Sequence, residues 1–228
     1  MESAQQWLDV VTHNLANAST SGYKRDGVVF NDTLSKALYG EDGRFVGRIG
    51  AGTSLSAQYT NMEVGTIMTT GNPLDVAIQS PKGFFAVETP SGVRYTRDGE
   101  FTLNVDRQLV TKQGLPVLDQ NNSPITIPPG KIEINGDGNL SVDGTDVAKI
   151  GIFDGEVEKI GDGLFRGVAM EGIDQPTLLS GAIEGSNVNA IEEMITMIRL
   201  NRIYEMAQRS AQSHDEMTQK LIQSAQNR

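Results

Sequence analysis

The two ends of this 228-residue chain carry the same helical pattern, and a long β-type stretch separates them. Near the N-terminus, apolar or small residues recur at four-three spacing at Ala4, Leu8, Val11, Leu15 and Ala18. Near the C-terminus the same spacing runs through Leu200, Tyr204, Ala207, Ala211, His214, Thr218, Leu221 and Ala225. Heptad spacing of this kind is typical of helices that pack along one another. It predicts either a polymer subunit whose ends build a shared core or an ordinary α+β domain whose end helices pack together.

Composition excludes several classes of protein. No apolar run is long enough to span a bilayer, and the N-terminus lacks the basic and apolar regions of a secretory signal. Cysteine is absent, which excludes disulfides, thiolate metal sites and cysteine nucleophiles. We therefore expect no membrane insertion and no cleaved signal peptide.

The acidity of the chain belongs to its middle. The net charge is −10, and residues 39–185 hold eleven basic against twenty acidic side chains. Near-neutral ends and an acidic centre are expected if the ends pack against protein and the centre faces solvent. An acidic chain without a basic stripe also argues against binding to nucleic acid.

The N-terminal third divides into a helical segment, 1–38, and an extended connector, 39–72. The helix is expected over 5–17 and should end near Gly22, since glycine suits the left-handed residue after a helix. The connector is rich in glycine and threonine and has no helical period, so we expect one or two strands in it.

Residues 73–175 are predicted to form an antiparallel β-domain of the sandwich or barrel type. Short apolar or alternating runs recur there, with turn residues between them. Asp98-Gly99 is predicted to be a hairpin turn, and Asn135–Gly138 and Asp143-Gly144 are predicted to be further turns. Strands are expected over 74–78, 83–87, 93–96, 101–103, 108–111, 116–118, 131–134, 139–142 and 149–153.

Residues 176–228 are predicted to be a return connector followed by one long helix. Asn189 and Glu192 imitate a capping box, and no glycine or proline interrupts the chain from there to Gln226. A helix of about 37 residues would be about 55 Å long. Its seam is weak, because small and polar residues fill the second half, so it should gain stability from neighbours.

No constellation of catalytic, metal-binding or cofactor-binding residues is visible. The two histidines, His13 and His214, are about 200 residues apart, and neither has a second ligand at helical spacing. The acidic residues gather at turns, where solvation is the usual reason for them. A hydrolase that uses carboxylates of the β-domain is therefore disfavoured, and the chain is expected not to be an enzyme.

Three stretches, in this order, resemble the flagellar basal-body rod and hook proteins of bacteria. The first, Leu8 to Arg25, contains an Asn-Leu-Ala-Asn run and a Gly-Tyr-Lys-Arg exit. The second contains Pro73 to Ile78, Gly83 to Val87 and Tyr95 to Phe101. The third contains Glu184 to Asn189, Glu193 to Ile195 and Arg202 to Glu205.

The resemblance implies a structural subunit of the flagellar rod. In such proteins the N- and C-terminal helices pair as a coiled coil in the polymer, which forms the drive shaft and the wall of the export channel. The expected partners are copies of the same chain, neighbouring rod proteins and the flagellar type III export apparatus. The expected location is the basal body, where the rod spans the periplasm.

The resemblance also assigns packing roles. Those expected to pack between helices are Leu8, Val11, Leu15, Ile195, Ile198, Tyr204 and Leu221. Those expected to fix helix ends and subunit contacts are Asn14, Asn17, Asn187 and Asn189. Family members usually have roughly ten more residues before Ser3, and a truncation there would shorten the inner helix by up to three turns.

Two alternatives remain open at this point. The short length and Gly185 favour the proximal-rod member over a distal-rod paralogue. A secreted β-domain that binds a surface or ligand, with its helices as an oligomerising stalk, is the alternative outside the family.

Overall fold

The computed structural model describes residues 2–32, 36–39, 45–49 and 53–226. The chain divides into two compact units, each built from separate stretches of sequence. The terminal unit contains Met1–Ala16, Asp26–Tyr59 and Asn189–Arg228. The β-unit contains Asn17–Arg25 and Thr60–Val188. The chain therefore passes between the units four times.

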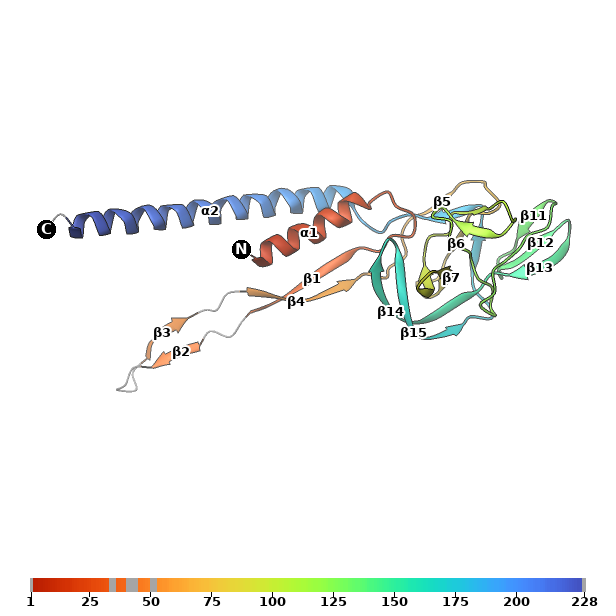
Figure 1. The fold of residues 1–228 in the computed structure, drawn as a ribbon, viewed down its shortest axis with the longest axis horizontal. Helices are drawn as coiled ribbons and strands as arrows, with labels where there is room; N and C mark the ends of the chain where they lie inside the picture. The colour runs from red at the N-terminus through yellow and green to blue at the C-terminus, as the bar shows by residue number, and fades with distance from the viewer. Residues whose placement is uncertain (1, 33–35, 40–44, 50–52, 227–228) are drawn as a thin grey trace. The chain divides into compact units, whose positions relative to one another are not determined.

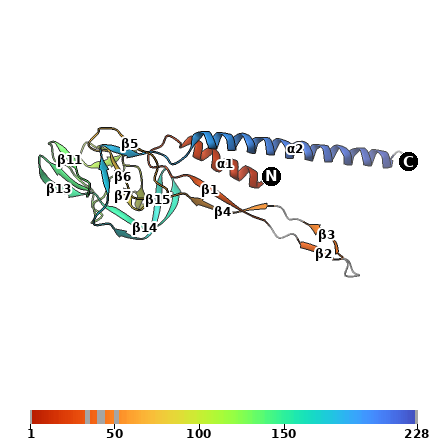
Figure 2. The same cartoon turned by 180° about the vertical axis from the view of Figure 1, so that it is seen from behind.

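The terminal unit consists of two helices and a β-ribbon (Figure 1). Its elements are α1 (Glu2–Ala16), β1 (Asp26–Asp32), β2 (Lys36–Tyr39), β3 (Phe45–Ile49), β4 (Thr53–Thr60) and α2 (Ala190–Gln226). The ribbon is formed by β1 with β4 and by the antiparallel pair β2 and β3. The helices α1 and α2 run antiparallel and side by side, as both views show (Figures 1 and 2).

The long C-terminal helix is confirmed at 37 residues. The side chain of Asn189 caps it, because its Oδ1 accepts from the N–H groups of Ile191 at 3.1 Å and Glu192 at 3.4 Å. Glu192 and Glu193 lie in the first turn, where carboxylates interact favourably with the helix dipole. No helix among the described residues is long and apolar enough to cross a membrane.

The β-unit is built from short strands whose registered pairs are all antiparallel. Four of them, β14-β15-β8-β7, close into a small barrel. The strands are β5 (Ile67–Thr69), β6 (Val76–Ile78), β7 (Phe84–Thr89), β8 (Gly92–Thr96), β9 (Phe101–Leu103), β10 (Leu109–Thr111), β11 (Ile132–Ile134), β12 (Asn139–Val142), β13 (Thr145–Lys149), β14 (Ile152–Gly161), β15 (Leu164–Gly172), β16 (Leu178–Ser180) and β17 (Ala182–Glu184). The predicted antiparallel β fold with helices at both ends of the chain is thus confirmed.

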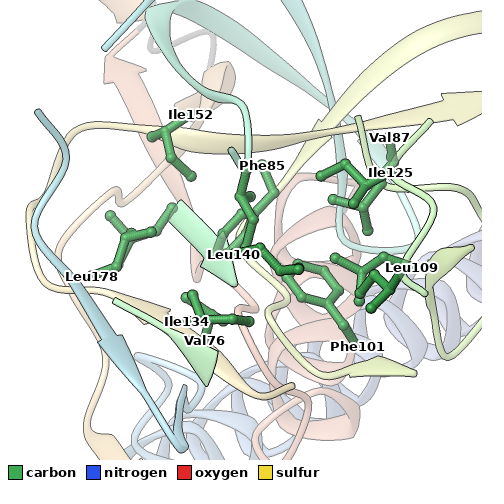
Figure 3. Packing of buried hydrophobic residues seen from close by; sticks show 14 of the residues in the cluster. Val76, Phe85, Val87, Phe101, Leu109, Ile125, Ile134, Leu140, Ile152 and Leu178 are labelled. Atoms are coloured by element: carbon green, nitrogen blue, oxygen red, sulfur yellow. The ribbon is translucent and has the colours of Figure 1, made fainter. Parts of the chain in front are cut away.

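A large apolar core lies inside the β-unit (Figure 3), and a second, smaller cluster contains Ala86, Leu118 and Phe153. Phe85, Leu109, Leu140 and Ile150 are fully buried in the large core. The rings of Phe85 and Phe101 meet edge to face with centroids 5.0 Å apart, a favourable aromatic geometry. Burying side chains of this size contributes about 1.5–3 kcal/mol each.

The turn at Asp143-Gly144 is confirmed, with φ of +50° and +81° between β12 and β13. The hairpin predicted at Asp98-Gly99 is wrong, since β8 pairs with β7 and β15, whereas β9 pairs with β10. Gly99 is required here by a close approach: a Cβ on it would lie 1.8 Å from the carbonyl oxygen of Val76. The Asp-Gly pair therefore carries the chain from one sheet to another.

Three other expectations about strands differ from the structure. The 39–72 stretch contains β3, β4 and β5, and β4 alternates apolar and polar residues, a period-two signal that its glycine-rich surroundings obscure. The 116–118 stretch forms only isolated bridges, such as Val87 to Val117. The predicted strand over 149–153 is divided between β13 and β14, because Gly151 packs against the backbone of Asp119.

Candidate functional site

One face of α2 packs against α1. Val11 of α1 and Leu200 of α2 are buried, and Leu8, Leu15 and Tyr204 are half-buried. On α2, Glu193, Met197, Leu200, Tyr204 and Ala207 follow four-three spacing and are all at least half-buried. This pattern is expected of a helix that presents one stripe to a neighbour.

A second face of α2 is apolar and uncovered. Ile195 is 45% exposed and Ile198 is 53% exposed, and neither lies on the buried stripe. Other large apolar side chains exposed on α2 are Ile191, Met194, Ile203, Met206 and Met217. Leu221 lies in α2, but its side chain is outside the described part of the structure. Ile191, Met194, Ile195 and Ile198 are neighbours at helical spacing, and exposed apolar side chains grouped in this way are typical of a protein-contact site.

Asn14 ties the end of α1 to the start of the ribbon. Its Nδ2 donates to the carbonyl oxygen of Asp26 at 2.8 Å, and its Oδ1 accepts from the N–H of Asp26 at 2.9 Å. Both residues are buried. The side-chain amide of Asn14 therefore bonds to both backbone groups of Asp26, as a neighbouring strand would. Burying these groups without hydrogen bonds would cost free energy.

Residues 17–25, here called the strap, belong to the β-unit although they follow α1 directly. The strap begins with two turns. The N–H of Thr20 donates to the carbonyl of Asn17, and the N–H of Tyr23 donates to the carbonyl of Thr20. The hydroxyl of Thr20 also donates to Oδ1 of Asn17 at 3.2 Å. Gly22 then lies against the backbone of Arg97 with a φ of +67°, where any Cβ would clash.

A buried cluster of three charges holds the strap in place. The ammonium of Lys24 donates to Oε1 of Glu184 at 2.6 Å, and the guanidinium of Arg97 lies 3.3 Å from Oε2 of the same carboxylate. All three side chains are at most 1% exposed. Burial lowers the pKa of Lys24, and the bond with Glu184 opposes that change.

The other polar atoms of the cluster are mostly bonded to backbone groups. Lys24 also donates to the carbonyl of Glu63 at 2.7 Å, and Oε1 of Glu184 accepts from the N–H of Gly65 at 2.9 Å. Arg97 donates to the carbonyls of Ser80 and Pro81, and it stacks on Phe84 with its Cζ 5.0 Å from the ring centroid. Such extensive bonding is what a buried ion cluster requires.

Asn187 joins three stretches of the chain close to where they leave the β-unit. Its Oδ1 accepts from the N–H of Arg25 at 2.7 Å. Its Nδ2 donates to the carbonyls of Asn61 at 2.9 Å and Glu63 at 3.0 Å. The N–H of Asn187 reaches the carbonyl of Tyr23 at 3.3 Å. One side chain therefore ties the strap to two other segments.

A carboxylate group next to the strap has an altered acidity. Burial raises the pKa of Asp98 to about 6, and the nearby carboxylates of Glu100 and Asp75 add to the rise. Glu100 itself accepts from the hydroxyl of Ser21 at 2.7 Å and from Lys112 at 2.6 Å. Within the described residues, no group of three His, Cys, Asp or Glu is placed to hold a metal ion.

The sequence motifs contain Lys24, Arg97 and Glu184, but their partnership was not visible from sequence. Lys24 is followed by Arg25 and Asp26, and Arg97 is followed by Asp98, so nothing in the local sequence sets these two cations apart from exposed ones. Lys24 and Glu184 are 160 positions apart, so only the fold pairs them.

Comparison with known proteins assigns the chain to a family. Family models match at residues 1–24 (flagella basal body rod protein), 77–142 (flagellar hook protein FlgE/F/G D1 domain) and 179–224 (flagellar basal body rod FlgEFG protein C-terminal). The flagellar basal-body rod protein FlgG of Buchnera aphidicola subsp. Schizaphis graminum is 33% identical over 98% of this chain and 95% of that protein. The chain belongs to the flagellar basal-body rod protein family. FlgF of Caulobacter vibrioides is 32% identical over 95% of the chain and 90% of its own length, and FlgG of Bacillus subtilis is 33% identical over 97% and 94%.

The buried cluster joins the three regions that the family models match. The rod family is a family of structural proteins of the flagellum, not of enzymes. Each of its three matched regions contributes one charge to the cluster: Lys24 from 1–24, Arg97 from 77–142 and Glu184 from 179–224. Asn187 also lies in the third region.

Proposed function

We propose that this chain polymerises helically through α1 and α2 to form part of the flagellar rod, the drive shaft and wall of the export channel. The uncovered apolar face of α2 is the observation that carries this proposal. Ile191, Ile195 and Ile198 would remain in water in an isolated chain. A side chain of this size gains about 1.5–3 kcal/mol when it is fully buried, so association along this face is favourable.

The packing roles follow from the two faces of α2. Leu8, Val11, Leu15 and Tyr204 pack α1 against α2 within one chain. Ile195 and Ile198 contact helices of neighbouring subunits, and Leu221 continues that role toward the end of α2. Asn14 and Asn17, Asn187 and Asn189 fix the ends of the two helices through the hydrogen bonds given above. In the polymer, the helix pairs form a coiled-coil layer.

The partners proposed are copies of the chain, neighbouring rod proteins and the flagellar type III export apparatus, which would export the chain without a cleaved signal. Family membership supports this set. We favour the proximal rod because the chain has Gly185 before α2. The β-domain assigned to 73–175 would form the outer part of the subunit, with 1–38 and 176–228 as its axial ends and 39–72 as a connector.

The test is deletion of the gene in its motile host, followed by complementation and electron cryotomography of the basal body. Wild type should restore rods, and the Ile198→Asp variant should leave basal bodies arrested without a complete rod. Val105→Asp is the matched control, because Val105 is fully exposed on a turn of the β-unit and should restore rods. The point of arrest separates the proximal from the distal rod. Complete rods with Ile198→Asp would contradict the proposal.

A further inference from the structure

The buried charge cluster is costly and unbalanced. Two cations, Lys24 and Arg97, share one carboxylate, Glu184, and Nε of Arg97 has no acceptor in the described part of the protein. Apolar residues of similar size often replace such a cluster without loss of stability, so stability alone does not explain it. The best-supported use of buried ionic groups is to specify one register among several.

The two helices need such a specification. The seam of α2 repeats at four-three spacing from Glu193 to Ala225, and its later positions are mostly small or polar. The 15 residues of α1 could therefore pair with the 37 residues of α2 at more than one heptad. A slip of one heptad moves the helices by about 10.5 Å.

The two connections that lead to the helices meet beside the cluster. Gly22 follows the end of α1 at Ala16 by six residues, and Glu184 precedes the start of α2 at Ala190 by six. The N–H of Gly22 donates to the carbonyl of Glu184 at 2.7 Å, so the two connections meet at this point.

Little slack remains in either connection. Asn187 is held by the strap, which leaves Val188 and Asn189 before α2, at most about 7 Å of extended chain. On the other side, the turns from Asn17 to Tyr23 shorten the strap. A heptad slip would therefore require the strap to leave its place against Glu184.

We propose that Lys24 is a positioning residue: by locking the strap to Glu184 and Arg97, it sets the register at which α1 pairs with α2. The proposal concerns one chain and does not depend on polymer formation. Its readout is the register of the helices in the purified full-length protein.

Disulfide trapping measures that register directly, since the chain has no cysteine of its own. Leu8→Cys on α1 is combined in turn with Met197→Cys, Leu200→Cys, Tyr204→Cys or Ala207→Cys on α2. Under mild oxidation, one pair should give most of the cross-linked monomer in the parent chain. Adding Lys24→Met should at least halve the yield of that pair and raise the yield of others.

Lys82→Met is the matched control. Lys82 is 76% exposed and lies 3.9 Å from Asp154, so the same substitution there should leave the yields unchanged. Glu184→Gln, which leaves two buried cations without a carboxylate, should disperse the yields more than Lys24→Met. Equal spread over all pairs in the parent chain, or one dominant pair in both cluster variants, would overturn the proposal.

Hydrogen exchange locates the effect. Lys24→Met should make the amides of the strap exchange at least about tenfold faster while the core strands β7 and β10 keep their protection. Loss of protection through the whole β-unit in Lys24→Met would assign the cluster to general stability and overturn the proposal.

Discussion

The β-unit and the terminal unit differ in how completely one chain buries their apolar side chains. In the β-unit, Phe85, Leu140 and Ile150 are fully buried in one core. In the terminal unit, α2 leaves Ile191 66% exposed and Met206 62% exposed. The β-unit therefore has an apolar core that one chain completes, whereas α2 of the terminal unit leaves large apolar side chains exposed.

Both units nevertheless use an asparagine side chain, buried for Asn14 and half-buried for Asn187, to join separate backbone segments. Asn14 pairs with the backbone of Asp26 in the terminal unit, and Asn187 joins three segments in the β-unit. An amide shielded from water selects which backbone groups lie next to it. A backbone group that found no hydrogen-bond partner there would raise the free energy of the folded state. The two units thus differ in how far their apolar side chains are buried. They are alike in using amide hydrogen bonds to fix which backbone segments meet.

The largest expected effect is a cavity in the β-unit. Phe85→Ala should lower the free energy of unfolding of the β-unit by about 3–5 kcal/mol, because Phe85 is fully buried against Phe101. Urea unfolding followed by hydrogen exchange measures the two units separately. Val105→Ala at a fully exposed turn is the control and should change stability by at most about 0.5 kcal/mol. An equal loss of protection in α2 would show that the units are not independent.

A smaller effect is expected from the amide of the terminal unit. Asn14→Ala removes both partners of the buried backbone of Asp26 and should cost about 2 kcal/mol. Fluorescence of Trp7, the single tryptophan, reports the unfolding of α1. Thr12→Ala, at an exposed position on the same helix, is the control and should cost much less. An unchanged midpoint with Asn14→Ala would contradict the role given to this residue.

Much of the fold follows from local sequence. The four-three stripes predict α1 and α2, and Asn189 predicts where α2 begins, because a helix start depends on adjacent residues. The turn at Asp143-Gly144 is equally local. Asp98-Gly99 has the same turn chemistry but crosses between sheets, and only the contact of Gly99 with Val76 explains why.

The rest depends on contacts that sequence does not reveal. The four-three stripe places Leu200 on the packed face of α2, but large apolar residues also occur on other faces, so the sequence does not tell that Ile198 remains exposed. The strap belongs to the β-unit through Lys24, whose partner Glu184 is 160 positions away. Neither the boundary of the units nor the buried cluster has a local signal.

We expect a pH dependence of stability that originates in the β-unit, which contains Asp98. The pKa of Asp98 is about 6 in the folded chain, against the ordinary value of 3.8 expected in the unfolded chain. Between these two pH values the folded state therefore binds more protons than the unfolded state. Stability from this group is therefore present at low pH and lost as pH rises through about 4 to 6.

The Asp98→Asn variant cannot ionise, so it does not lose stability as the pH rises through this range. Its side-chain oxygen can still accept from the N–H of Glu100. The variant should be more stable than the parent by about 1–2 kcal/mol above pH 7, after allowance for solvent screening, and equal to it below about pH 4. Urea titrations across pH measure the difference. A gap that does not change with pH would mean that Asp98 has the same pKa in the folded and the unfolded chain.

The smallest expected effect lies at the start of α2. Asn189→Ala removes the acceptor for the N–H groups of Ile191 and Glu192 and should cost about 1 kcal/mol, mostly within the first helical turn. Asn189→Ser retains a capping oxygen and is the matched control, with a loss of a few tenths of a kcal/mol. Hydrogen exchange should show faster exchange near Ile191 and unchanged protection in β7. If the β-unit lost protection as well, the two units would be coupled through this residue, and the contrast between a self-contained β-unit and an incomplete terminal unit would fail.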